Sequence, residues 1–108
     1  MTETNEALFL DQVCTIARLQ GWLVFHPTPH RVGTASWRTD GKGFPDLVLC
    51  HMDRGTIFAE LKTNDGRLSE EQKQWGYRLT QHSEYHVWRP RDLETIAQRL
   101  GSKRNQQK

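Results

Sequence analysis

The chain has 108 residues, 35% of them hydrophobic and 26% charged, with a formal net charge of +2 at pH 7. That length supports one domain with one modest core and excludes a second domain. No apolar run approaches the roughly 18 residues of a membrane-spanning helix, and no secretory leader pattern is recognisable. Two cysteines cannot form a disulfide framework. We therefore expect a soluble, cytoplasmic protein with no membrane partner and no small-molecule cofactor.

The first third of the chain predicts one helix and one strand. An apolar stripe of helical spacing runs over residues 4–20, and Gly21 after it is a typical helix stop. Glu6 lies on that stripe and not opposite it. A helix-start glutamate favoured by the helix dipole is the ordinary explanation of such a residue. Residues 22–26 then predict a strand, which Pro27 ends.

Residues 27–43 show neither helical nor strand periodicity. A loop of this length in a compact domain is usually functional or disordered. Basic side chains beside an aromatic ring suit a nucleic-acid backbone, although Trp37 equally fits a core anchor. The candidate DNA-binding residues are His30, Arg31, Arg38 and Lys42.

The centre of the chain predicts a β-hairpin that carries two opposed carboxylates. Two runs rich in β-branched and aromatic residues, 43–50 and 56–62, flank a polar turn of about five residues. With the turn centred on Asp53, Asp46 faces Glu60 on one side of the hairpin, and their side-chain roots are about 5 Å apart. Such like charges repel each other, so a divalent cation with oxygen ligands is the expected neutralising group.

Two ordinary explanations compete with a metal site. Glu60 and Lys62 are also a plausible exposed charged pair, and Pro45-Asp46 also serves simply to open a strand. A register slip of one residue would put Asp46 and Glu60 on opposite faces and remove the site. The site hypothesis therefore depends on the predicted register.

The last third of the chain predicts helix, strand and helix. Residues 69–72 form a capping box that opens a helix ending near His82. Residues 85–88 predict a strand parallel to the second strand of the hairpin, because a helix connects the two. Residues 92–100 predict the final helix, with Ala97 among its inward residues. The result is one α/β domain, residues 1–101, in the order αβββαβα around a four-stranded mixed sheet flanked by helices, followed by a basic flexible tail, 102–108.

Together these residues resemble the VRR-NUC (virus-type replication-repair nuclease) branch of the PD-(D/E)xK nuclease superfamily. The resemblance extends from about residue 6 to about residue 100 and implies a restriction-endonuclease-like core. The residues that carry it are Glu6, Gly21-Trp22, Gly43-Phe44-Pro45-Asp46-Leu47, Glu60-Leu61-Lys62, Ser69-Glu70-Glu71-Gln72 and Trp75.

The resemblance also implies roles for individual residues. Lys62 would orient the attacking water or stabilise developing negative charge. Gln72 would lie beside Lys62 and position water or the scissile phosphate, and we interpret this role as an alternative to its place in the capping box. The implied ligands of Mg²⁺ or Mn²⁺ are Asp46, Glu60, Glu6 and the carbonyl group of Leu61.

The implied reaction is the hydrolysis of a DNA phosphodiester bond, in a bacterial or phage-infected cell. Small relatives are similar to Holliday-junction resolvases, which implies branched DNA and a homodimer, because a two-fold junction matches two-fold protein symmetry. Large side chains such as Leu8, Trp22 and Trp88 also favour a dimer, since one small core does not cover them all. Two alternatives stay open: a sequence-specific or flap- and nick-processing nuclease, and a non-catalytic DNA-binding phage module.

Overall fold

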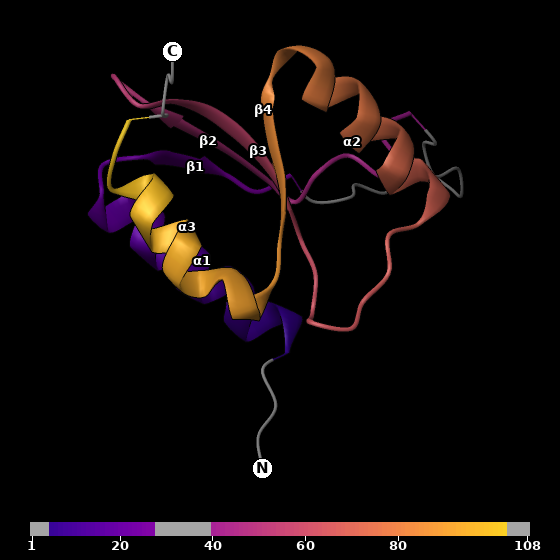
Figure 1. The fold of residues 1–108 in the computed structure, drawn as a ribbon, viewed down its shortest axis with the longest axis horizontal. Helices are drawn as coiled ribbons and strands as arrows, with labels where there is room; N and C mark the ends of the chain where they lie inside the picture. Colours follow the sequence, from indigo (N-terminus) through magenta and orange to yellow (C-terminus); the bar gives the residue numbers. More distant parts are fainter. Residues whose placement is uncertain (1–4, 28–39, 104–108) are drawn as a thin grey trace, which may run out of the picture.

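The computed structural model describes residues 5–27 and 40–103 (Figure 1). Its helices and strands follow the predicted order, with a short 3₁₀ turn added before the last helix. The elements are α1 (Glu6–Leu19), β1 (Leu23–Phe25), β2 (Leu47–His51), β3 (Gly55–Leu61), α2 (Glu70–His82), β4 (Glu84–Trp88), η1 (Pro90–Asp92) and α3 (Leu93–Leu100). Among the described residues, no helix is both long and apolar enough to cross a lipid bilayer.

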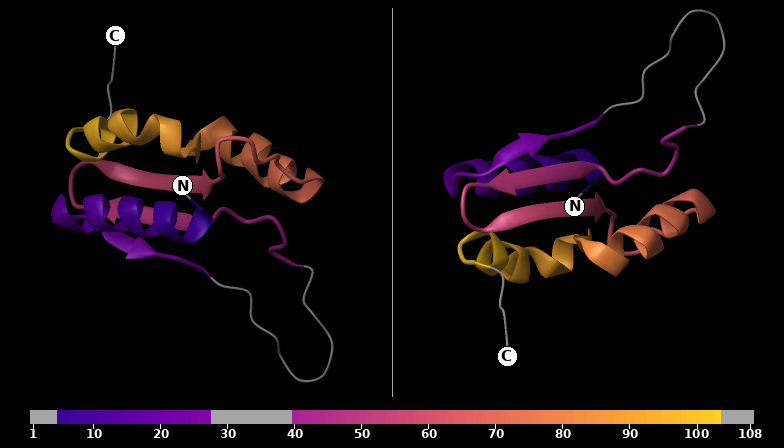
Figure 2. Two further views of the ribbon diagram at one scale, coloured as in Figure 1. Left: turned by 90° about the horizontal axis from the view of Figure 1, so that it is seen from below. Right: turned by 90° about the horizontal axis from the view of Figure 1, so that it is seen from above.

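The four strands form one mixed sheet in the order β1-β2-β3-β4. β2 is antiparallel to both β1 and β3, whereas β4 is parallel to β3, as the helical crossover predicts. Figure 2 shows the hairpin of β2 and β3 as two antiparallel arrows joined at one end. Val48 pairs with Phe58, which is the predicted register. The turn, residues 52–54, is shorter than the predicted five residues but has the predicted centre.

Helices cover both faces of this sheet. α1 and α3 lie together on one face, and α2 lies on the other side of β4 (Figure 1). Side chains alternate along β3, so Ala59 and Leu61 point toward α1 and α3 while Glu60 points toward α2. The core between the sheet and the α1–α3 pair contains Phe9, Val13, Ala17, Trp22, Leu47, Leu49, Ile57, Ala59, Leu61, Trp88, Ile96 and Leu100.

Two local predictions need correction, and a third lies mostly outside the described residues. The side chain of Asn5 caps α1 by accepting a hydrogen bond from the N–H of Leu8 at 2.8 Å, whereas residue 4 was predicted to start the helix. Ala97 is exposed, so α3 turns a narrower apolar stripe inward than predicted. The predicted basic tail is described only as far as Lys103.

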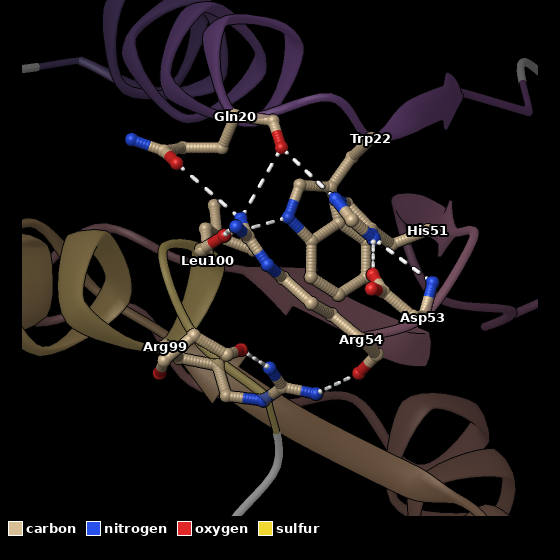
Figure 3. Close-up of polar contacts among 8 residues, drawn as sticks. Gln20, Trp22, His51, Asp53, Arg54, Arg99 and Leu100 are labelled. Carbon is tan, nitrogen blue, oxygen red and sulfur yellow. Dashed lines mark hydrogen bonds and ion pairs between the residues drawn. The ribbon is translucent and has the colours of Figure 1, made fainter.

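The hairpin turn is tied to the C-terminal ends of α1 and α3 (Figure 3). Arg54 Nη1 donates to the carbonyl oxygens of Leu100 at 2.9 Å and of Gln20 at 3.3 Å. Arg99 Nη2 donates to the carbonyl oxygen of Arg54 at 2.7 Å, and Trp22 Nε1 donates to that of Leu100 at 2.8 Å. A guanidinium at two helix C-termini is stabilising because the helix dipoles are negative there. This end of the hairpin is therefore fixed, and the carboxylates lie at its other end.

Candidate active site

Asp46 lies directly before β2, where its side chain extends the hydrogen bonding of the hairpin. Its Oδ2 accepts a hydrogen bond from the N–H of Leu61 at 2.9 Å, and the preceding Pro45 is fully buried. The N–H and C=O of one strand residue point to the same neighbouring strand, so the carbonyl of Leu61 is directed to the side of Asp46. Continuing the observed β2–β3 register by one residue pair beyond Leu47 and Ala59 sets Asp46 opposite Glu60.

Glu60 is a carboxyl group with little charge compensation from the protein. Only 2% of the residue is exposed. Its Oε2 accepts a hydrogen bond from Gln72 Nε2 at 2.8 Å, and Lys62 Nζ lies 4.0 Å from the same oxygen. Burial first, and then the charge of Asp46, raise the pKa of Glu60 to about 8 against the opposing effect of Lys62. Without a cation, this carboxyl group is therefore largely protonated at neutral pH.

Gln72 belongs to the capping box of α2 and contacts Glu60 at the same time. Its Oε1 accepts from the N–H of Ser69 at 2.8 Å, and its own N–H donates to Ser69 Oγ at 3.1 Å, which completes the capping box. Its Nε2 donates to Glu60 at the same time. Opposite ends of one amide group make the contacts with Ser69 and Glu60, and the role of Gln72 in positioning water or phosphate stays a prediction. The helix cap fixes the amide so that its donor faces Glu60.

Tyr85 is a neighbour of the carboxylates that the sequence reasoning missed. It pairs with Phe58 across β3 and β4, and Gly76 of α2 packs on its ring: a Cβ at Gly76 would lie 2.7 Å from Tyr85 Oη. Burial, and then the charges of Glu60 and Asp46, raise the pKa of Tyr85 to about 12. The phenol is therefore a neutral hydrogen-bond donor. The sequence already predicted that β3 and β4 are parallel neighbours, and this pairing could have indicated that Tyr85 lies near Glu60.

Arg89 was also missed, although it holds the turn that follows Lys62. Its Nη1 donates to the carbonyl oxygens of Thr63 and Gly66, each at 2.7 Å. The N–H of Lys62 donates to the carbonyl oxygen of Trp88 at 3.0 Å. The backbone of Lys62 is therefore held by its hydrogen bond to β4 and by the turn that Arg89 stabilises after it.

Several other predicted site residues lie apart from this cluster or outside the described residues. Glu6 is exposed in the first turn of α1, and its charge is the smallest of the effects that raise the pKa of Glu60. Lys42 is exposed, with its Nζ 3.7 Å from Glu71 Oε2. His30, Arg31 and Arg38 lie outside the described residues. The roles of Glu6 and Lys42 stay predictions.

The fold and the site together define a class of protein: an α/β domain in which two opposed carboxyl groups and a lysine gather at one end of a mixed sheet. A comparison with protein families supports this class, since the model of the VRR-NUC domain matches residues 29–91, more than half of the chain. The chain belongs to the VRR-NUC domain family, and it is a nuclease domain. The match includes Asp46, Glu60, Lys62 and Gln72, whereas Glu6 precedes it. No curated protein and no solved structure matches the chain.

Nucleases of this family typically use divalent metal ions, and the donor set fits such an ion. Two carboxyl groups and the Leu61 carbonyl offer the hard oxygen donors that Mg²⁺ and Mn²⁺ prefer. Burial and the charge of Asp46 raise the pKa of Glu60, and a cation bound between the two carboxyl groups would oppose both effects. Over residues 5–27 and 40–103, no three His, Cys, Asp or Glu side chains gather closely enough to hold a metal, so water and DNA oxygens would complete the ligand shell.

Proposed function

We propose that this nuclease domain is a metal-dependent DNA endonuclease whose catalytic residues are Asp46, Glu60, Lys62 and Gln72. The observation that carries the proposal is the Asp46–Glu60 pair, in which the buried Glu60 faces the half-buried Asp46 and has its pKa raised to about 8. A stable fold gains nothing from a buried carboxyl group that faces a second one unless a cation or a proton separates their charges. A divalent cation at this position would lower the pKa of bound water and neutralise negative charge on the phosphate.

The side chains of the protein would have separate roles in the reaction. Asp46 and Glu60 hold oxygen donors at a fixed separation, because one accepts from the Leu61 backbone and the other from Gln72. Lys62, with 15% of its side chain exposed, presents an ammonium group toward developing negative charge at the phosphate or toward the attacking water. Glu6, the first residue of α1, is exposed and would be a secondary ligand, acting through water.

The test is a DNA-nicking assay with Mg²⁺, Mn²⁺ or EDTA. Asp46→Asn and Glu60→Gln should abolish cleavage, and Lys62→Ala should lower the rate by about 100- to 1000-fold. Glu94→Gln, which removes an exposed carboxylate in the first turn of α3, is the matched control and should cut like the parent. Asp46→Asn should bind DNA without metal at least as well as the parent, since it relieves repulsion. Normal cleavage by any of the three variants would refute the site.

We further propose that the substrate is branched DNA, cut by a homodimer in replication, repair or recombination. The support is the similarity of small relatives to Holliday-junction resolvases and the exposed apolar edge of the sheet. Leu23 and Phe25 of edge strand β1 are 75% and 61% exposed, a surface that a second copy would cover. Of the large side chains expected to favour a dimer, Trp22 and Trp88 are buried in the core and Leu8 is 49% exposed.

A panel of junction, flap, nicked and linear DNA separates this proposal from its alternatives. Preference for the junction supports a resolvase-like enzyme, and preference for flaps or nicks supports a processing nuclease. Sequence-dependent cutting of linear DNA supports a sequence-specific enzyme, and no cleavage of any substrate supports a DNA-binding phage module. Sedimentation with and without junction DNA tests the dimer; a monomer at micromolar concentration in both would contradict it.

A further inference from the structure

Gly43 makes an unusually close backbone contact with the first turn of α2. Its φ is +88°, and a Cβ at this position would lie 2.5 Å from the carbonyl carbon of Glu71 and 2.7 Å from the nitrogen of Gln72. Both neighbours are backbone atoms, which cannot swing aside as the end of a side chain does. Only glycine combines this left-handed conformation with so close an approach.

The residues on either side of Gly43 also contact α2. The Lys42 ammonium pairs with Glu71 at 3.7 Å, although both side chains are exposed and the pair is weak. The ring of Phe44 meets the ring of Trp75 edge to face, with centroids 4.9 Å apart. Residues 42–44 therefore dock along the first two turns of α2, and Gly43 is the point of closest approach.

This docked segment lies between two groups of the active site. On one side, the α2 turn that touches Gly43 carries Gln72, whose amide donates to Glu60 at 2.8 Å. On the other side, the chain reaches Asp46 three residues later, and Asp46 accepts from the N–H of Leu61 at 2.9 Å. The separation between Gly43 and α2 therefore influences how Asp46 and Gln72 lie relative to Glu60.

We propose that Gly43 is a positioning residue for the nuclease reaction, and that its missing side chain sets the spacing between the Asp46 segment and the turn of α2 that orients Glu60. This inference rests on the proposed function of Asp46 and Glu60. A methyl group at Gly43 would push the two segments apart by about 1 Å, and a displacement of that size is enough to lower a rate about 100-fold.

Gly41 offers a matched control. Its φ is +85°, close to that of Gly43, but a Cβ there would meet nothing within 4 Å. Gly41→Ala and Gly43→Ala thus impose the same left-handed backbone strain, and only Gly43→Ala adds the collision with α2. A difference between the two variants isolates the contact from the strain.

The experiment measures Mn²⁺ binding to the metal-free protein by calorimetry and single-turnover cleavage of saturating DNA. Gly43→Ala should bind Mn²⁺ about 10- to 100-fold more weakly than Gly41→Ala and cut about 100-fold more slowly, while its KM for DNA changes little. Equal Mn²⁺ affinity and equal cleavage in the two variants would overturn the positioning role. If the parent binds Mn²⁺ but cuts no DNA, the proposed function fails, and the Mn²⁺ difference still decides the role of Gly43.

Phe44→Leu keeps the proposal testable if Gly43→Ala does not fold. It loosens the same docked segment by removing the edge-to-face contact with Trp75, without adding a collision. Weaker Mn²⁺ binding than the parent, in the same direction as expected for Gly43→Ala, supports the proposal. Unchanged Mn²⁺ affinity in a folded Phe44→Leu protein overturns it.

Discussion

Two buried glutamates lie on neighbouring strands, Glu60 on β3 and Glu84 on β4, and their pKa values are shifted in opposite directions. Glu60 is 2% exposed and Glu84 is 7% exposed, so burial alone would raise the pKa of both. For Glu84, hydrogen bonds from Arg99 Nε at 2.7 Å and Nη2 at 2.8 Å, and one with His86 at 2.8 Å, outweigh burial and lower its pKa. For Glu60, burial and the neighbouring carboxyl group of Asp46 act together and raise the pKa of Glu60 to about 8.

The difference separates a buried charge that the protein balances from one that it leaves largely unbalanced. At Glu84, the protein itself supplies the compensating cation, and Arg99 also binds the carbonyl oxygen of Arg54 at the hairpin turn (Figure 3). At Glu60, the protein supplies a neutral amide and a lysine 4.0 Å away, which do not balance two carboxylates. The first arrangement stabilises the domain as folded, and the second leaves a demand for positive charge.

The largest expected effect is on stability and concerns Glu84, whose charge Arg99 balances. Arg99→Met should lower the free energy of unfolding by about 3–5 kcal/mol, because it leaves the buried Glu84 without its main cation. Glu60→Gln should leave stability unchanged or raise it in metal-free buffer, because it removes a repelling carboxyl group. Urea unfolding of the two variants measures the contrast. Similar destabilisation by both would show that Glu60 is a structural residue like Glu84.

Divalent cations should stabilise the folded protein by binding to the carboxylates of Asp46 and Glu60. At a Mn²⁺ concentration of about 100 times its Kd, the parent protein should gain about 2.7 kcal/mol in the free energy of unfolding. Asp46→Asn should gain much less, because one of its two carboxylate ligands is lost. Thermal melts with and without Mn²⁺ test this, with Glu94→Gln as the control that should respond like the parent. An equal gain in Asp46→Asn would place the Mn²⁺ site elsewhere.

Stability should also depend on pH in a way that Glu60 dominates. The folded pKa of about 8 exceeds the usual value of 4.5, so between these values the folded state binds more protons than the unfolded state. Metal-free stability should therefore fall as pH rises from about 5 to 8, by at most about 1.4 kcal/mol per pH unit for one proton. Glu60→Gln should flatten this dependence. Denaturant titrations at several pH values measure it, and an unchanged slope in the variant would contradict the raised pKa.

The smallest expected effect concerns Glu6. Since Glu6 is exposed and contributes least to the raised pKa of Glu60, Glu6→Gln should lose only part of the activity at limiting Mg²⁺. Raised Mn²⁺ should restore much of that loss, because water replaces a carboxylate in an oxygen ligand shell. Initial cleavage rates over a metal titration give the comparison. Unchanged activity at limiting Mg²⁺ would make Glu6 only a helix-start residue.

The sequence by itself determined the features that depend on local spacing. Period-two alternation around a turn centred on Asp53 set Asp46 against Glu60, and the spacing of Ser69 and Gln72 set the helix cap. The helical connection between the last two strands made them parallel, because that crossover has one favoured hand. Each of these follows from backbone geometry over a few residues or from a general rule of chain connection.

Tertiary structure alone decided which side chains surround the carboxyl groups. Gln72 reaches Glu60 from 12 residues away, and Arg99 reaches Glu84 from 15 residues away, because α2 and α3 pack on opposite faces of the sheet. The contact of Gly43 with α2 likewise joins residues that no periodic pattern connects. Such contacts depend on how far helices stand from the sheet and on side-chain reach. The local sequence therefore indicated that Glu60 faces another carboxylate, but only the packing of α3 on the sheet supplied Arg99 to balance Glu84.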